Sequence, residues 1–373
     1  MIQCSRFKNK CFFNKNRRVR MKAVLLGYGT VGKGVEILCK NIDDIIIQQV
    51  FVRPNKVSLP YFSSDGIEMV SQEDINIVFE CLNGIEPANT LITCALEHGK
   101  HVITSNKAVV SYNLERYVEL SKRYGGSIQV EACVAGGIPF LDALLKLSQF
   151  EDIQGYEGIF NGTNNYILDQ MQSYNLDFDT ALQQAQQLGY AEANPSNDIE
   201  GMDVFYKANI ANMLAYHTKN ENILAPIGIS KINREDIRYA KEHHKIIRHL
   251  AISKQERNHF STIIAPCFLS EKDPLANVPD NYNAQFIYAH SFHKLGYFGQ
   301  GAGQLATAQA MLANAMDTLH HRERDLDLHN QKQVDAHLLQ CDWLVRKDGI
   351  YSLIEQTNMP EIDAYDMISI WRD

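Results

Sequence analysis

Apolar residues in the first third of the chain come in short, nearly continuous runs that alternate with longer amphipathic stretches. Such short apolar runs are typical of strands that are buried on both faces of a parallel sheet. The runs occupy residues 22–26, 45–52, 75–79, 101–104 and 128–132, and helical patterns occupy 87–99 and 114–124. This alternation predicts an α/β fold of the Rossmann type, with a doubly wound parallel sheet over residues 21–135.

The pattern changes after residue 135. Strand-like runs occupy 155–160, 260–269 and 284–292, and helical stretches occupy 207–216 and 305–319. We therefore expect an α+β domain over residues 136–295, with a return of the chain to the first domain at about 296–318.

The stretch 236–249 is amphipathic, which is typical of a surface helix. It carries His243, His244 and His249. We expect these histidines to have no role in binding metal.

The two ends of the chain differ from its body. Residues 1–20 hold seven Lys or Arg residues, no acid and no apolar core of signal-peptide length, so we expect a disordered leader before a start at Met21. Residues 319–373 begin with a charged stretch and end in alternating strand-like runs. They predict a short C-terminal extension, for which the sequence indicates no role.

Composition excludes several classes of protein. Outside the leader the chain has 29 basic and 44 acidic residues, and this acidic balance disfavours nucleic acid as a partner. No uninterrupted apolar stretch approaches the ~18 residues of a membrane span. The eight cysteines are scattered without a CxxC pair, which argues against a zinc ribbon or a disulfide framework and favours the cytoplasm.

A glycine motif follows the first predicted strand directly. Gly27, Gly29 and Gly32 form a GxGxxG pattern, with Thr30 and Val31 at the start of the predicted helix. Glycines permit a tight turn, and the N–H groups at a helix start bind a pyrophosphate. The motif predicts a dinucleotide site, although a plain glycine turn between packed elements would look the same.

Arg53 and Lys56 follow the second predicted strand, where NAD-specific folds present an acid to the ribose hydroxyls. Cations at this point can pair with the 2′-phosphate of NADP. We therefore predict a preference for NADPH over NADH. The alternative is that both cations lie in solvent.

Three further polar or glycine segments are expected at the carboxyl edge of the sheet, where ligands of such folds bind. Asn83 and Gly84 follow one strand, Ser105 and Lys107 follow the next, and a late glycine loop ends at Gly303. We expect all of these to contact the cofactor, and Lys107 also to reach the substrate.

Residues 189–207 concentrate ionisable groups. The carboxylates are Glu192, Asp198, Glu200 and Asp203. Lys207 follows Asp203 by four positions, which places both on one helix face in a favourable orientation. Asn197 or Asp198 could cap that helix. The alternative interpretation is a capped, salt-bridged surface helix.

The segment 131–139, EACVAGGIP, contains a glycine pair that interrupts any regular element. Turns of this kind can direct several carbonyl oxygens at a small hard cation, or they can simply turn the chain. The sequence does not separate these two possibilities.

Together these motifs resemble the homoserine dehydrogenase family. The matching segments are GxGxxG at 27–32, TSNKA at 104–108, EACVAGGIP at 131–139, GIFNGTNNYIL at 158–168, LGYAEANPSNDIEGMD with its lysine at 188–207, NA at 283–284 and GQGAGQLATA at 299–308. They occur in the family's order over roughly residues 21–318. The resemblance implies reversible hydride transfer between L-aspartate 4-semialdehyde and L-homoserine with NAD(P)H.

The resemblance also implies residue roles. Lys207 is the expected proton donor, which Asp203 would orient, and Lys107 is a second candidate for proton transfer or substrate contact. Glu192, Asp198 and Asp203 are expected to bind the substrate. A sodium ion is expected on the carbonyls of Glu131, Val134, Gly136 and Ile138. The second domain is expected to bind substrate and to form a homodimer or a dimer of dimers.

The chain departs from the family pattern at three positions. Asn194 and Asn314 stand where the family has or often has Asp, and Ala306 stands where it usually has Pro. The extension looks too short for a complete regulatory domain of the ACT type. Two alternatives remain open: an acylating semialdehyde dehydrogenase with Cys133 as nucleophile, and a nucleotide sensor without catalysis.

Overall fold

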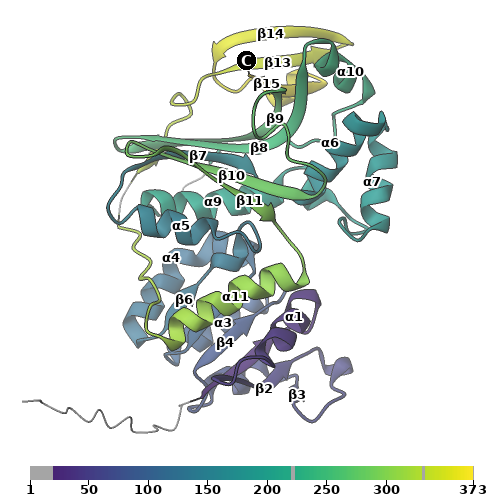
Figure 1. Cartoon of the computed structure of the whole chain (residues 1–373). Coiled ribbons are helices and arrows are strands. Elements are labelled where there is room, and N and C mark those ends of the chain that lie inside the picture. Colours follow the sequence, from purple (N-terminus) through teal and green to yellow (C-terminus); the bar gives the residue numbers. More distant parts are fainter. Residues whose placement is uncertain (1–19, 220–222, 330–331, 373) are drawn as a thin grey trace, which may run out of the picture.

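The structure, a computed structural model, describes residues 20–219, 223–329 and 332–372. The expected leader therefore lies outside the described residues, apart from Arg20. Two sheets dominate the fold, with helices between them (Figure 1). The first sheet is built from the N-terminal part of the chain, and the second from the remainder.

Six parallel strands form the first sheet in the order β3-β2-β1-β4-β5-β6. They are β1 (Met21–Leu26), β2 (Ile45–Phe51), β3 (Phe62–Ser63), β4 (Ile77–Glu80), β5 (His101–Thr104) and β6 (Ser127–Gln129). This is the strand order of a Rossmann fold, in which dinucleotides bind beyond the carboxyl ends of the strands where the order reverses. The doubly wound sheet predicted from the sequence is confirmed.

Helices connect these strands. They are α1 (Thr30–Cys39), the short 3₁₀ turn η1 (Pro54–Lys56), α2 (Gly66–Ser71), α3 (Ala88–Glu97) and α4 (Lys107–Tyr124). The side chain of Asn106 caps α4 by accepting from the Val109 N–H, and Gly125 ends it with a φ of 78°. Lys107 is therefore fixed as the first residue of a capped helix.

Nine strands form the second sheet, in the order β11-β10-β7-β8-β9-β15-β13-β14, with β12 paired to β9. They are β7 (Ile153–Ile159), β8 (Lys245–Glu256), β9 (His259–Ser270), β10 (Tyr282–Ala289), β11 (His293–Gln300), β12 (Gln333–Val334), β13 (Cys341–Lys347), β14 (Ile350–Thr357) and β15 (Met367–Trp371). Most neighbours are antiparallel, but β15 and β12 run parallel to β9.

The C-terminal extension is not a separate appendage, because its strands continue the second sheet. The Arg372 N–H donates to the Phe268 carbonyl at 3.0 Å, and the Arg372 guanidinium lies 2.8 Å from the buried carboxylate of Glu157 on β7. Trp343 of β13 and Ile370 of β15 are buried in the core of this sheet.

The 3₁₀ turn η2 (Glu131–Cys133) contacts β5 of the first sheet. The helices after it are α5 (Phe140–Leu147), α6 (Gly162–Tyr174), α7 (Phe178–Gln187), α8 (Ser196–Ile199), α9 (Met202–Tyr216), α10 (Arg234–Glu242) and η3 (Ile362–Ala364). Of these, α6, α9 and α10 pack against the second sheet. Figure 1 shows α5 and α9 between the two sheets. Almost all of α9 is buried, so it carries its charged residues into the interior.

The expected helix over residues 236–249 is wrong in its second half. The helix α10 ends at Glu242, His244 adopts a left-handed φ of 55°, and β8 begins at Lys245. In the first half of β8 both faces of the strand are largely buried. Its apolar residues Ile246, Ile247 and Leu250 therefore do not alternate as in a half-exposed strand, and they also match helical spacing.

The late glycine loop is also shorter than expected, since residues 296–300 belong to β11. After Gly303 the chain enters α11 (Gln304–Leu319), which packs against α1. A Cβ at Gly34 of α1 would lie 2.4 Å from the Gln304 carbonyl oxygen, so a glycine is needed for this close approach. In the described ranges, no helix is long and apolar enough to span a membrane.

Candidate active site

The glycine motif forms the turn between β1 and α1. Gly27 has a φ of 99°, and a Cβ there would lie 2.9 Å from the Cys81 carbonyl oxygen. A Cβ at Gly32 would lie 2.1 Å from the Gly27 carbonyl oxygen. Gly29 occupies the N-cap, where no side chain caps the helix. The first N–H groups of α1, at Thr30 and Val31, are therefore left for a ligand or solvent.

Arg53 and Lys56 lie just beyond the carboxyl end of β2, the strand beside β1. Both side chains are exposed. Gly27 N donates to the Phe51 carbonyl at 3.1 Å, which ties the glycine turn to the end of β2. The two cations thus follow a strand that is fixed next to the expected phosphate site.

The remaining predicted cofactor residues extend this edge. Asn83 and Gly84 are exposed after β4, Ser105 follows β5, and Gly303 forms the N-cap of α11. A Cβ added at Gly29, Gly84 or Gly303 would meet no atom within 4 Å. The main chain at these positions therefore faces open space, as a cradle for a cofactor requires.

Asp203 is the centre of a buried charged cluster. Its Oδ1 lies 3.0 Å from the Lys107 ammonium and its Oδ2 lies 2.7 Å from the Lys207 ammonium. Lys207 also donates to the Phe160 carbonyl at 2.6 Å. The Lys207 side chain is 9% exposed and that of Lys107 is 40% exposed. The structure brings these three predicted residues together from α4 and α9.

Asn161 links Asp203 to Asp198. Its side-chain amide donates to Asp198 Oδ1 at 2.7 Å and to Asp203 Oδ2 at 2.8 Å, while its oxygen caps α6. The sequence pattern predicts no role for this residue. The polar turn before α6 was visible as a motif, but only the fold shows that it reaches residues some 40 positions later.

A second layer lies behind Asp198. The Asn164 amide donates to the Asp198 carbonyl at 2.8 Å and contacts His249 Nδ1 at 3.0 Å. His249 Nε2 must carry a hydrogen, because it lies 2.9 Å from the Ile227 carbonyl, which can only accept. Burial lowers the pKa of His249 to about 4, so the ring is a neutral support at physiological pH.

The charges of the cluster influence one another. Burial alone would raise the pKa of Asp203, but the Lys107 and Lys207 ammoniums outweigh it and hold that pKa below its usual range. The Asp203 charge raises the pKa of Lys107 despite burial. Burial, with the nearby charge of Asp203, raises the pKa of Asp198. Asp203 is thus ionised, with an ammonium near each oxygen.

Glu192 and Glu200 are not drawn into this cluster. Both are exposed, and the structure records for Glu192 a main-chain contact, from the Gln186 amide to its carbonyl at 3.0 Å. The expected capping by Asn197 or Asp198 is wrong: α9 begins after Gly201, which has a φ of 83° and no side-chain cap. The Asp198 carboxylate accepts from Asn161 instead.

The Asn194 side chain closes a local turn by accepting from the Ser196 N–H at 3.3 Å and the Ser196 hydroxyl at 2.7 Å. It is exposed. Since the oxygen does the accepting, an Asp would make the same contacts.

Cys133 is poorly suited to be a nucleophile. It is 2% exposed, its thiol donates to the Thr104 carbonyl at 3.3 Å, and burial raises its pKa well above the ordinary value. The thiolate is the reactive form of cysteine. The geometry therefore disfavours an acyl-enzyme at this position.

The turn after η2 departs from regular secondary structure. Ala135 and Gly136 both have positive φ values, 58° and 57°. The Glu131 carbonyl accepts from Val134 N at 3.2 Å and the Ile138 carbonyl from Phe140 N at 2.8 Å. Each of these two oxygens keeps a second lone pair for a cation.

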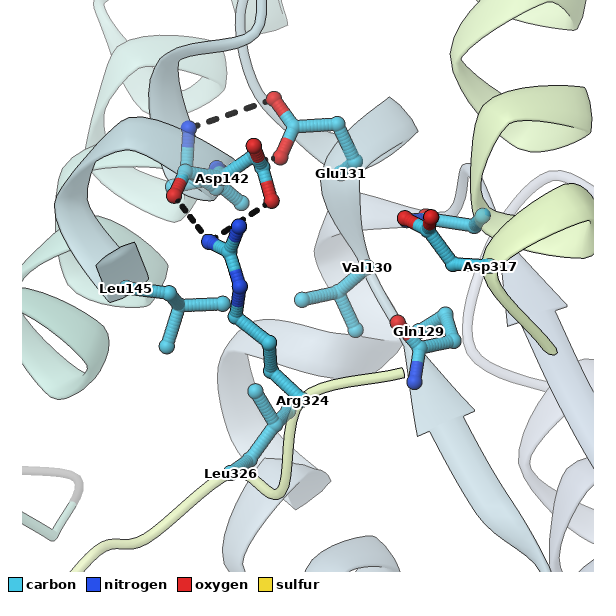
Figure 2. A pocket seen from close by; sticks show the side chains of 10 residues that line it. Gln129, Val130, Glu131, Asp142, Leu145, Asp317, Arg324 and Leu326 are labelled. Carbon is cyan, nitrogen blue, oxygen red and sulfur yellow. Dashed lines mark hydrogen bonds and ion pairs between the residues drawn. The ribbon is translucent and has the colours of Figure 1, made fainter. Parts of the chain in front are cut away.

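The Glu131 side chain has a different role, shown in Figure 2. Its carboxylate accepts from the N–H groups of Leu141 and Asp142 at 3.2 and 2.6 Å, which caps the start of α5. Arg324 pairs with the Asp142 carboxylate at 2.8 Å, and both residues line a cavity of about 20 Å³. That volume suits about one water molecule. Asn314, one of the departures from the family pattern, lines this cavity, which includes neither Asp203 nor either lysine.

Comparisons with known proteins agree with this geometry. Two family models match: "Homoserine dehydrogenase, NAD binding domain" over residues 27–131 and "Homoserine dehydrogenase" over residues 139–316. The homoserine dehydrogenase of Synechocystis sp. is 37% identical over 80% of this chain and 73% of its own length. That of Corynebacterium glutamicum is 33% identical over 78% and 70%. A crystal structure of a homoserine dehydrogenase from Thiobacillus denitrificans matches with a TM-score of 0.82 and 30% identity, covering 88% of this chain and 84% of that one.

Proposed function

The chain belongs to the homoserine dehydrogenase family, and we infer that it is an NAD(P)-dependent oxidoreductase that interconverts L-aspartate 4-semialdehyde and L-homoserine. The observation that carries this function is the double ion pair on Asp203. One carboxylate holds Lys107, beyond the cofactor edge of the first sheet, and Lys207, on a buried helix of the second part. The pair thus joins the two halves of a hydride-transfer site.

We propose that Lys207 donates the proton. A bound nicotinamide supplies the hydride, and negative charge then grows on the aldehyde oxygen. An ammonium at that oxygen stabilises the charge and delivers a proton. Two acceptors, the Phe160 carbonyl and Asp203, fix the Lys207 ammonium. The more exposed Lys107 is the second candidate for proton transfer and a candidate contact for substrate.

The substrate carries an ammonium group as well as a carboxylate, so carboxylates suit its amino-acid end. We propose Glu192, Asp198 and Asp203 for this contact. Asp198 is supported by Asn161 and Asn164, whose hydrogen bonds fix its position. Glu192 lies on an exposed segment, and its assignment depends on the motif match.

We propose NADPH as the preferred cofactor. The uncapped start of α1 suits the pyrophosphate, and the exposed Arg53 and Lys56 can pair with a 2′-phosphate. Asn83, Gly84, Ser105, Lys107 and Gly303 complete the proposed contacts along the same edge.

We also propose a sodium site on the carbonyl oxygens of Glu131, Val134, Gly136 and Ile138. The two consecutive left-handed residues in this turn and its hard oxygen donors support it. Turnover in sodium chloride should exceed turnover in choline chloride at equal ionic strength.

The second sheet is the proposed region of self-association. We propose a homodimer, or a dimer of dimers, located in the cytoplasm. Light scattering on the purified chain measures its molar mass and therefore its oligomeric state.

Spectrophotometric formation of NADPH from L-homoserine at alkaline pH tests the function itself. We expect turnover with L-homoserine and none with D-homoserine. A chain that binds NADPH but forms none from homoserine would be a nucleotide sensor instead.

A further inference from the structure

Glu80 is a buried acid that the proposed reaction does not use. It is the last residue of β4 and is 0% exposed. Its sheet partner is Thr104, the last residue of β5. The loops that follow these two strands carry Asn83 and Gly84 on one side and Lys107 on the other, so Glu80 lies at the base of both.

Hydrogen bonds connect Glu80 to each loop. Its Oε1 accepts from the Leu82 N–H at 2.8 Å, and its Oε2 accepts from the Thr104 hydroxyl. The Thr104 oxygen accepts in turn from the Asn106 N–H at 2.9 Å. The Asn106 amide donates to the Gly84 carbonyl at 2.7 Å. The chain of bonds thus runs from one loop through the carboxylate to the other.

The same network ends at a proposed catalytic group. Asn106 caps α4, of which Lys107 is the first residue, and the Lys107 ammonium pairs with Asp203. A movement of Thr104 or Asn106 would therefore displace both the Gly84 carbonyl and the origin of the Lys107 side chain.

The surroundings of Glu80 place its titration near neutral pH. Burial raises the pKa of Glu80 to about 7, although the hydrogen bonds from Thr104 and Leu82 oppose this. The ionisable groups that face it are Cys81, Tyr117 of α4 and Cys133, and burial raises the pKa of each of these. All three are neutral at pH 7, so their charge does not change as Glu80 titrates.

We propose that Glu80 is a positioning residue whose ionised carboxylate holds the cofactor loop at Gly84 and the Lys107 turn in one fixed relation. The proposal rests on the proposed function of these loops. When Glu80 is ionised, it accepts the Thr104 hydrogen. Protonation on Oε2 leaves Oε1 to accept from Leu82 and makes Oε2 a donor to the Thr104 oxygen, which also accepts from Asn106, so the Thr104 hydrogen loses Glu80 as its acceptor.

Glu80→Gln mimics the protonated state, because the Gln amide accepts from Leu82 but donates to Thr104. NADPH binding to wild type and variant is measured by the fluorescence of the cofactor between pH 5.5 and 8.5. We expect the variant to bind about tenfold more weakly at pH 8.5 and nearly equally at pH 5.5. The two affinities become equal at low pH because protonated Glu80 in the wild type makes the same hydrogen bonds as the Gln side chain in the variant.

Protonation of the cofactor itself affects its binding to both proteins equally, so it cannot change the ratio of the two affinities with pH. Thr104→Val should weaken binding at high pH in the same way, whereas Thr104→Ser, which keeps the hydroxyl, should restore it. A constant ratio between wild type and Glu80→Gln at every pH would overturn the proposal and leave a structural role only.

A second readout separates this proposal from the function on which it rests. Wild type without homoserine oxidation at any pH would contradict the proposed function. If wild type is active and Glu80→Gln shows the same pH profile of kcat/KM for NADPH as wild type, the result would contradict only the positioning role of Glu80. If Glu80→Gln does not fold, the Thr104→Val and Thr104→Ser pair decides, because both retain the buried acid.

Discussion

At the cofactor edge, the residues that face the expected dinucleotide are glycines and exposed cations, whereas in the Asp203 cluster each charged group is held by another side chain or a carbonyl. The edge depends on main-chain shape: a Cβ at Gly27 or Gly32 would collide with neighbouring carbonyl oxygens. The cluster depends on charge balance, since Asp203 sits between two ammoniums and Asn161 joins it to Asp198.

This difference indicates that mutations in the two regions should impair different properties of the enzyme. Changes at the edge should alter which cofactor binds and how tightly. Changes in the cluster should alter turnover while cofactor binding persists. Lys107 is the exception, because it begins at the edge and ends in the cluster.

The largest effect is expected for Lys207→Ala. Loss of the proposed proton donor should lower kcat by on the order of 10²–10⁴, with the dissociation constant of NADPH nearly unchanged. Steady-state kinetics and cofactor fluorescence measure the two quantities. Lys107→Ala is the matched control, since it should impair both. Near-normal turnover of Lys207→Ala would remove Lys207 from the acid–base role.

Asp203→Asn removes the charge that balances both lysines. Leaving the buried Lys207 ammonium without its carboxylate costs about 3 kcal/mol of unfolding free energy, and kcat/KM should fall about 10²-fold. The depressed pKa of Asp203 means that wild type gains stability from its ionised form above the unfolded value near 3.8 and loses it as the pH falls further. Denaturant unfolding should therefore show a difference in unfolding free energy between wild type and variant, and this difference should decrease as the pH falls below about 3.8. A difference in unfolding free energy that does not change with pH would contradict the role of the Asp203 charge in balancing the two lysines.

Arg53→Ala tests the edge with a smaller effect. Removing one exposed cation should lower the NADPH-to-NADH ratio of kcat/KM about tenfold, since Lys56 remains. Lys40→Ala, which removes an exposed cation at the C-terminal end of α1, is the control. An unchanged ratio in Arg53→Ala would remove the 2′-phosphate assignment.

The cofactor edge could be predicted from the sequence because its signals are local. GxGxxG occupies six consecutive positions, and the strand before it is a plain apolar run. Asp203 and Lys207 were likewise visible, as a pair four residues apart on one helix.

The contacts that complete the cluster join distant positions, and local pattern does not contain them. Asn161 reaches Asp203 from another helix, and His249 supports Asn164 from a strand that the sequence suggested as helix. Glu80 directly follows the apolar run 75–79, but its hydrogen bond to Thr104 joins two neighbouring strands and is not visible in the local pattern.

The order of strands in the second sheet has a consequence for how the chain folds. The β13–β14 hairpin precedes β15 in sequence, yet β15 stands between the hairpin and β9. The hairpin can form early from local contacts, but it has no place on the sheet until β15 has paired with β9, a contact that spans about a hundred residues. Because pairing over such separations is slow, closure of this end of the sheet should be a late event. The β13 strand can pair with β15 locally, so the strand edge that remains unpaired until closure is the β15 edge that joins β9.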